Sequence, residues 1–157
     1  MKTYPLEIKL NGELRSVDVE AKETLLEALR NKFGATEVKN GCGKGDCGSC
    51  TVLLDGQPVN SCLTLALQAQ GKDVLTLKGL GGEDRPHPLQ KSFAERGAIQ
   101  CGFCSAGMML SAKALLDRHP RPSREEIREA ISGNLCRCTG YKKIIDAIED
   151  ASLEAKS

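Results

Sequence analysis

The chain has 157 residues, of which only 3% are aromatic, and it contains no tryptophan. Its 22 lysines and arginines nearly balance its 21 aspartates and glutamates, so no excess of positive charge points to a nucleic acid or an anionic membrane as partner. This length suits one ordinary domain or two small ones, and small cores so poor in aromatic side chains need additional stabilising bonds. The eight cysteines are the obvious source of such bonds.

The use of these cysteines depends on the redox compartment. The first ten residues, MKTYPLEIKL, contain no continuous apolar stretch of the kind that a secretory signal or a membrane span requires. We therefore expect a cytoplasmic protein. Because disulfide bonds are rare in that reducing compartment, the cysteines indicate metal ligation or redox chemistry rather than a disulfide framework.

The chain begins with a pattern typical of a β-hairpin and a short helix. Apolar and polar side chains alternate over residues 8–19, and the Asn-Gly pair at 11–12 favours a tight turn with positive φ. The period then changes, because Thr24 and Glu27 form the signature of a capping box ahead of a helix that ends before Gly34.

A glycine-rich loop and three short strands are predicted next. No regular element tolerates the glycine density of residues 40–50, NGCGKGDCGSC, which we expect to form a loop. Residues 51–54 predict a buried strand, 55–56 a turn, 59–62 its partner strand and 74–77 a last strand. Together with the hairpin and helix, these elements predict an α+β unit in which a small sheet packs on one helix.

The second half of the chain has a different composition and period. Residues 78–88, KGLGGEDRPHP, concentrate glycine, proline and charge, so we place a linker at 79–88 between a first domain at 1–78 and a second at 89–157. Beyond the linker the period is helical, which predicts a small four-helix domain with helices at 89–96, 106–118, 124–131 and 141–153.

Three local expectations accompany these helices. Ser123 and Glu126 form a second capping-box signature, at the start of the third helix. We expect His87 and His119, which both lie beside prolines, to be exposed loop residues. Residues 154–157 are expected to form a frayed tail.

The cysteines divide evenly between the two predicted domains: Cys42, Cys47, Cys50 and Cys62 in the first, and Cys101, Cys104, Cys136 and Cys138 in the second. The first three follow C-x4-C-x2-C, the spacing of plant-type [2Fe–2S] ferredoxins, whose fourth ligand comes from elsewhere in the chain. The intervening glycines allow backbone N–H groups to turn toward an anionic cluster. Zinc is the alternative, although structural zinc usually takes its ligands as two C-x2-C-like pairs.

The second tetrad, C-x2-C followed at a distance by C-x-C, is less specific, and its spacing alone suits zinc as well as an iron–sulfur cluster. Its placement favours the cluster. Each cysteine pair precedes a predicted helix, so two helix N-termini with positive dipole ends would converge on one anionic centre.

Three segments carry a family resemblance: GCGKGDCGSCTVLLDG, QCGFCSAGM and GNLCRCTGY. They closely resemble the iron–sulfur subunit of molybdenum hydroxylases, the family of xanthine dehydrogenase and carbon monoxide dehydrogenase. The resemblance covers nearly the whole chain, and the short interval between Cys50 and Cys62 matches this family rather than free plant ferredoxins. It implies an N-terminal β-grasp ferredoxin-like domain, a C-terminal four-helix bundle and two [2Fe–2S] clusters in series.

The resemblance also implies partners. In the family the helical-domain cluster lies nearer a molybdenum–pterin (molybdopterin) cofactor and the other cluster nearer a flavin, so we expect a molybdopterin-binding large subunit and an FAD-binding medium subunit. By position, Gln100 and Cys138 would approach the pterin, and Cys138 would also ligate iron. No acid/base pair, phosphate loop or activated nucleophile is visible, so we assign no catalytic residue and expect the substrate chemistry on a partner chain.

Three hypotheses follow. The chain is an electron-transfer subunit of a molybdenum hydroxylase, a free ferredoxin-like carrier, or a zinc-stabilised interaction module. The near-neutral charge and the extra helical domain disfavour the free carrier, because such carriers tend to be small and strongly acidic. The substrate of the complex is not encoded in this chain if the substrate pocket belongs to the large subunit.

Overall fold

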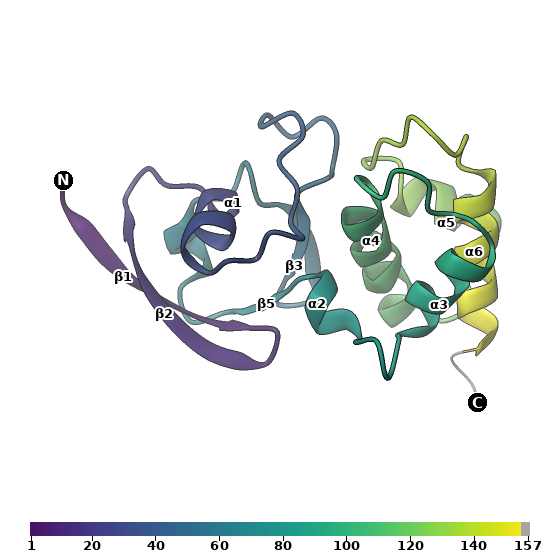
Figure 1. Ribbon diagram of the computed structural model, residues 1–157, viewed down its shortest axis with the longest axis horizontal. Helices are drawn as coiled ribbons and strands as arrows, with labels where there is room; N and C mark the ends of the chain where they lie inside the picture. The colour runs from purple at the N-terminus through teal and green to yellow at the C-terminus, as the bar shows by residue number, and fades with distance from the viewer. Residues whose placement is uncertain (155–157) are drawn as a thin grey trace.

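The computed structural model describes residues 1–154, which form a sheet half and a helical half side by side along the long axis of the molecule (Figure 1). Strands and helices are both present, as the predicted α+β class requires. Of the expected tail, Glu154 belongs to the last helix, and residues 155–157 lie outside the described residues.

Within residues 1–154 the sheet has five strands: β1 (Thr3–Leu10), β2 (Glu13–Glu20), β3 (Thr51–Leu54), β4 (Gln57–Asn60) and β5 (Asp73–Leu75). Their order is β2-β1-β5-β3-β4, with β5 parallel to β1 and the other neighbours antiparallel. The hairpin prediction is confirmed, because Asn11 and Gly12 have φ of 52° and 88°, as a type I′ turn requires.

Short helical segments cover this sheet. Thr24 caps α1 (Leu25–Glu27) through the predicted capping box, in which the Thr24 N–H donates to the Glu27 carboxylate over 2.8 Å. The chain then continues as the π-helical segment η1 (Ala28–Lys32), where an ordinary α-helix was expected. The 3-10 segment η2 (Ala66–Ala69) was not predicted.

Two predicted strands end early, each because a side chain captures a backbone group. β4 ends at Asn60 rather than at residue 62, since the Ser61 hydroxyl donates to the carbonyl oxygen of Cys50 over 2.7 Å and turns the chain. β5 ends at Leu75, since the N–H of Thr76 donates to the Asn11 side chain over 2.8 Å. The short helix α2 (Leu77–Leu80) follows, where the end of a strand and the start of a linker were expected.

The helical half contains α3 (Pro88–Glu95), α4 (Ser105–Arg118), α5 (Arg124–Ala130) and α6 (Lys142–Glu154), and each begins and ends within one residue of its predicted range. These helices enclose a core separate from that of the sheet half, and its largest fully buried side chains include Leu89, Phe93, Met108, Ile127, Ile144 and Ile148.

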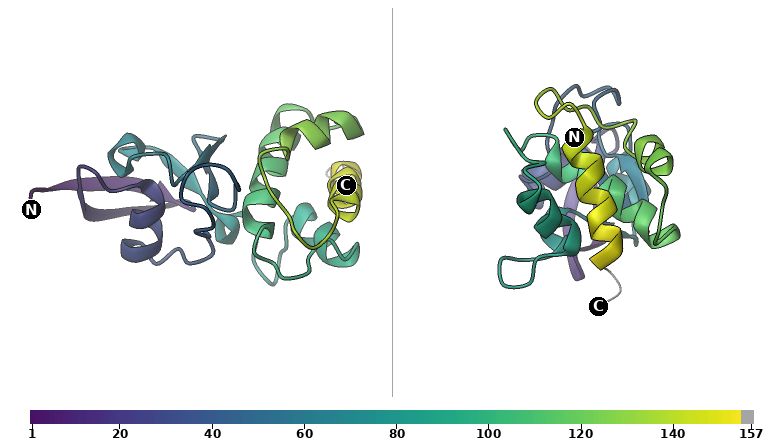
Figure 2. Two further views of the ribbon diagram at one scale, coloured as in Figure 1. Left: turned by 90° about the horizontal axis from the view of Figure 1, so that it is seen from above. Right: turned by 90° about the vertical axis from the view of Figure 1, so that its right-hand side faces the viewer.

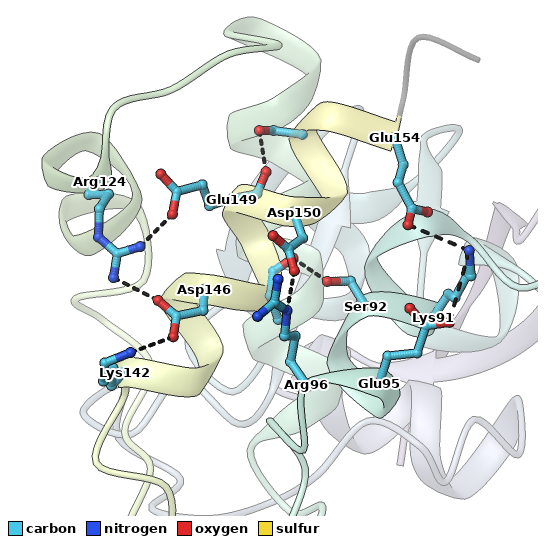
Figure 3. Close-up of polar contacts among 12 residues, drawn as sticks. Lys91, Ser92, Glu95, Arg96, Arg124, Lys142, Asp146, Glu149, Asp150 and Glu154 are labelled. Atoms are coloured by element: carbon cyan, nitrogen blue, oxygen red, sulfur yellow. Dashed lines mark hydrogen bonds and ion pairs between the residues drawn. The ribbon is translucent and has the colours of Figure 1, made fainter.

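Polar contacts join α6 to its neighbours α3 and α5 (Figure 3). The Ser92 hydroxyl of α3 donates to the carbonyl oxygen of Ala147 over 2.6 Å. Arg124, the first residue of α5, pairs with Asp146 over 2.8 Å and also with Glu149. Side chains of α3 and α5 therefore hold α6 in place within the helical half.

The two histidines differ from each other. The prediction that His87 is exposed is wrong: its ring is half-buried, burial lowers its pKa, and its Nδ1 accepts the N–H of Leu89 over 3.2 Å at the start of α3. The ring thus acts as a helix cap, a position more often filled by Ser, Thr, Asp or Asn. The prediction for His119 is confirmed, because its side chain is 51% exposed.

The two halves meet where α4 packs against β3. Leu110 and Ala114 of α4 form a small apolar cluster with Leu53 and Leu75 of the sheet. The glycine-rich loop at 40–50 and the loop between α5 and α6 lie at the same end of the molecule, toward the top in Figure 1 and in the right-hand view of Figure 2. Among residues 1–154, no helix has the length and apolar character needed to cross a membrane.

Candidate iron–sulfur sites

The glycine-rich loop surrounds the sulfur of Cys42 with backbone donors. Three N–H groups point at this sulfur over 3.2 to 3.5 Å, those of Lys44, Asp46 and Cys47. Gly45 allows the loop to bend this way, because its φ of 84° is unfavourable for other residues. The N–H of Lys44, followed by that of Cys47, lowers the pKa of the Cys42 thiol to about 6. Cys42 is therefore held ready as a thiolate, the form that binds metal.

The other cysteines of the first tetrad complete the site beneath the loop. Cys50 and Cys62 are buried, and their thiols contact each other. Burial, and then the neighbouring Cys50 thiol, raises the pKa of Cys62 to about 11. Cys47 contacts Cys42 and lies 3.1 Å from the Ser49 hydroxyl. The four thiols therefore lie near one another, Cys42 and Cys47 partly exposed and Cys50 and Cys62 buried.

The second tetrad lies between the N-terminal ends of two helices. Cys104 directly precedes α4, and Cys136 and Cys138 lie in the loop that leads into α6. The thiols again contact in pairs, Cys104 with Cys136 and Cys101 with Cys138. Burial raises the pKa of Cys104 to about 12, whereas Cys101 and Cys138 are exposed.

Two residues that the sequence did not single out support Cys136. Burial opposes ionisation of its thiol, but hydrogen bonds from Thr139, from the Cys138 N–H and from the Cys104 thiol together lower its pKa. The Thr139 hydroxyl lies 3.1 Å from the Cys136 sulfur, and the Cys136 N–H donates to the Tyr141 hydroxyl over 2.8 Å. Both residues belong to the segment CTGY, and a threonine directly after C-x-C is the signal that could have identified Thr139.

The donor set of each half suits a two-iron cluster. The thiols of each tetrad lie near enough to influence one another: Cys62 is affected by both Cys50 and Cys42, and Cys104 by both Cys136 and Cys101. In a [2Fe–2S] cluster four cysteine thiolates bind two irons, so the four cysteines of each half are a matching donor set.

Gln100 and Cys138, predicted from the resemblance as pterin contacts, are both exposed on the helical half. Both are next to Cys101, since Gln100 precedes it in the chain and the Cys138 thiol interacts with it. Both side chains are therefore accessible to a partner at the edge of the second tetrad.

Taken together, the fold and the two cysteine sites define an iron–sulfur protein. Comparison with known proteins agrees. The chain matches the family models of a 2Fe-2S iron-sulfur cluster binding domain over residues 8–76 and of a [2Fe-2S] binding domain over residues 76–149.

Known relatives specify the family. The chain is 50% identical to the nicotinate dehydrogenase small FeS subunit of Eubacterium barkeri over 96% of each chain. It is 49% identical to the nicotine 6-hydroxylase small subunit of Paenarthrobacter nicotinovorans, over 93% of this chain and 88% of that one. A chain of quinoline 2-oxidoreductase from Pseudomonas putida 86 superimposes with a TM-score of 0.95 at 49% identity, covering 99% of this chain and 96% of that one.

The chain therefore belongs to the small iron–sulfur subunits of the molybdenum hydroxylase family, and it is an electron-transferring subunit of an oxidoreductase. This confirms the family that the three cysteine motifs predicted.

Proposed function

We propose that the chain holds two [2Fe–2S] clusters and passes electrons singly between a molybdopterin site and a flavin on partner subunits. The gathering of four cysteines in each half, with three backbone N–H groups directed at the Cys42 sulfur and the Thr139 hydroxyl beside the Cys136 sulfur, carries this proposal. The ligands of the first cluster are Cys42, Cys47, Cys50 and Cys62, and those of the second are Cys101, Cys104, Cys136 and Cys138. Each cluster takes up one electron, which divides a two-electron substrate oxidation into single steps.

Each cluster has its own domain in this proposal. The first domain spans residues 1–78 and the second 89–157, with the linker at 79–88, and the separate cores of the sheet and helical halves support this division. The second domain is the four-helix bundle of the family, in which the ends of α4 and α6 face the cluster ligands. Their positive dipole ends stabilise the negative charge of the reduced centre.

Exposed apolar side chains beside the cysteines support docking onto partner subunits. Ile99 and Phe103 flank Cys101 and are 39% and 46% exposed, and Leu135, next to Cys136, is 56% exposed. A molybdopterin-binding subunit covering this surface would bury them and exclude water from the second cluster. Gln100 and Cys138 are then the contacts nearest the pterin.

The first cluster has a comparable exposed neighbour. Leu63 directly follows Cys62 and is 63% exposed, which suits contact with an FAD-binding subunit on that side. We place the assembled complex in the cytoplasm, where reduced thiols are available for cluster insertion.

Electron paramagnetic resonance of the dithionite-reduced protein, with iron and sulfide assays, tests this function. We expect two distinct [2Fe–2S] signals of near one spin each, and equal amounts of iron and acid-labile sulfide. A colourless protein that contains zinc and no sulfide would refute the proposal and establish a zinc-stabilised module instead.

Co-purification separates a subunit from a free carrier. We expect affinity purification from the native host to recover a molybdopterin-containing chain together with this one. A cluster-loaded monomer that exchanges electrons without any partner would contradict the subunit role and leave cluster binding intact.

A further inference from the structure

The loops that carry the two cysteine tetrads are joined by one buried side chain. We propose that Asn134 is a positioning residue that sets the spacing between the two clusters and keeps a hydrogen-bonded route open between them. This inference rests on the proposed function, because it requires a cluster in each half.

The Asn134 side chain makes three hydrogen bonds, two to the sheet half and one within the helical half. It is only 4% exposed. Its Nδ2 donates to the carbonyl oxygen of Gly48 over 3.0 Å and to the Thr51 hydroxyl over 3.3 Å, both in the sheet half. Its Oδ1 accepts the hydroxyl of Ser111, on α4, over 2.7 Å. A buried polar side chain satisfied in this way orients the groups that it contacts.

The main chain beside Asn134 links the two tetrads directly. The N–H of Leu135 donates to the carbonyl oxygen of Cys47 over 2.9 Å. Cys47 belongs to the first tetrad, and Leu135 is bonded to Cys136 of the second. One hydrogen bond therefore completes a path of covalent bonds from a thiol of one site to a thiol of the other.

The contact between the two loops requires their backbones to lie very close together, which glycines allow. A Cβ at Gly48 would lie 2.2 Å from the carbonyl oxygen of Gly133, and a Cβ at Gly107 would lie 2.4 Å from the carbonyl oxygen of Gly48. With so little space, two neighbouring hydrogen bonds hold the first loop against the second: the Asn134 amide binds the carbonyl oxygen of Gly48, and the Leu135 N–H binds that of Cys47. Losing the Asn134 amide frees the Gly48 carbonyl and lets this part of the first loop move away, which lengthens the path between the clusters.

The test compares Asn134→Ala with the wild-type, both cluster-loaded. The primary measurement is the magnetic interaction between the two reduced clusters in the paramagnetic resonance spectrum, which weakens with the cube of their separation. We expect Asn134→Ala to make the splitting caused by this interaction smaller and less uniform, while each cluster keeps its full spin. Amide hydrogen exchange gives a second measurement, in which we expect Leu135 to exchange at least tenfold faster.

Two further variants complete the design. Thr51→Val removes the hydroxyl that accepts from Asn134 and donates to the Gly48 carbonyl over 2.7 Å, while Asn134 keeps its own bond to that carbonyl. We therefore expect a smaller effect in the same direction, measurable even if Asn134→Ala does not fold. Asn31→Ala, at an exposed position on η1, is the matched control and is expected to change neither measurement.

The role of Asn134 and the presence of the two clusters can fail separately. If Asn134→Ala and Thr51→Val only lower the thermal unfolding temperature, with wild-type magnetic coupling and Leu135 exchange, the side chain is merely structural and the inference is wrong. If the wild-type itself lacks two cluster signals, the proposed function fails, and this inference fails with it.

Discussion

At the scale of single residues, Cys47 and Cys136 belong to different thiol tetrads, which makes the two sites separately testable. We expect Cys47→Ser to abolish or shift one [2Fe–2S] signal and Cys136→Ser the other, because a serine oxygen is a poor substitute for a thiolate ligand. Paramagnetic resonance of the two reduced variants provides the measurement. A single substitution that removed both signals would mean that the tetrads do not assemble independently.

The Thr139 hydroxyl offers a prediction about reduction potential. Its oxygen accepts the N–H of Tyr141 over 3.2 Å, so its hydrogen is free to point at the Cys136 sulfur, 3.1 Å away. A hydrogen bond to a ligand sulfur favours the more negative, reduced cluster. We expect Thr139→Val to lower the potential of the second cluster by on the order of 40 mV, which corresponds to about 1 kcal/mol for one electron.

A matched variant in the sheet half controls this experiment. The Ser49 hydroxyl lies 3.1 Å from the sulfur of Cys47, in the same relation to the first site. In a redox titration, Ser49→Ala is expected to lower the potential of the first cluster alone, and Thr139→Val that of the second alone. Equal shifts of both clusters in either variant would argue against a local hydrogen-bond effect.

At the scale of elements, the capping box of α5 gives a pH-dependent prediction. The Glu126 carboxylate accepts the N–H of Ser123 over 2.7 Å, and this bond, with the Ser123 hydroxyl and His119, lowers the pKa of Glu126 below its usual 4.5. A lowered pKa means that the ionised group adds stability above pH 4.5, and that this stability is lost as the pH falls through the lower folded value.

We therefore expect Glu126→Gln to be less stable than the wild-type near neutral pH, and the difference to shrink as the pH falls below 4.5 and Glu126 becomes protonated in the folded chain as well as the unfolded one. Urea unfolding at several pH values measures the difference, with a sulfide assay showing at each pH that both chains keep the same cluster content. Glu125→Gln is the control, because that side chain is 71% exposed. A stability difference that is constant with pH would mean that the carboxylate charge does not contribute.

The elements themselves were largely predictable, since most of them depend on local patterns. The Asn11-Gly12 turn, both capping boxes and the apolar period of α3 to α6 are each encoded within a few residues. The predictions were wrong where an element ends, or a side chain is buried, because of residues far away in the sequence. β5 ends because Asn11 binds Thr76, sixty-five positions later in the chain, and His87 is half-buried because other residues pack around its ring.

At the scale of the whole molecule, the sequence predicted two tetrads but not how they approach each other. Spacing identifies candidate ligands because each tetrad has its own short motifs. The packing of α4 on β3 and the buried position of Asn134 depend on contacts between residues far apart in the chain. Thr139 and Tyr141 were missed because the pattern C-x-C-T gives only a position in the sequence, whereas their contacts with Cys136 depend on how the loop folds.

The contact between the halves can be tested through Gly107. Replacing a glycine within a helix by alanine normally stabilises the helix by about 1 kcal/mol. Here the added Cβ would lie 2.4 Å from the carbonyl oxygen of Gly48, a backbone atom of the other half that cannot turn aside as a flexible side chain would. We therefore expect Gly107→Ala to destabilise the protein by about 1 to 3 kcal/mol, as overpacked interiors do.

Calorimetric unfolding measures this effect, and Gly133→Ala is the matched control because a Cβ at Gly133 meets nothing within 4 Å. That control is expected to stay within about 0.5 kcal/mol of the wild-type. If Gly107→Ala instead raised the unfolding temperature, helix propensity would outweigh the collision, and the two halves could not be packed through α4 and the Gly48 carbonyl in solution. The close approach of the two cysteine sites therefore depends on the absence of a single methyl group from α4.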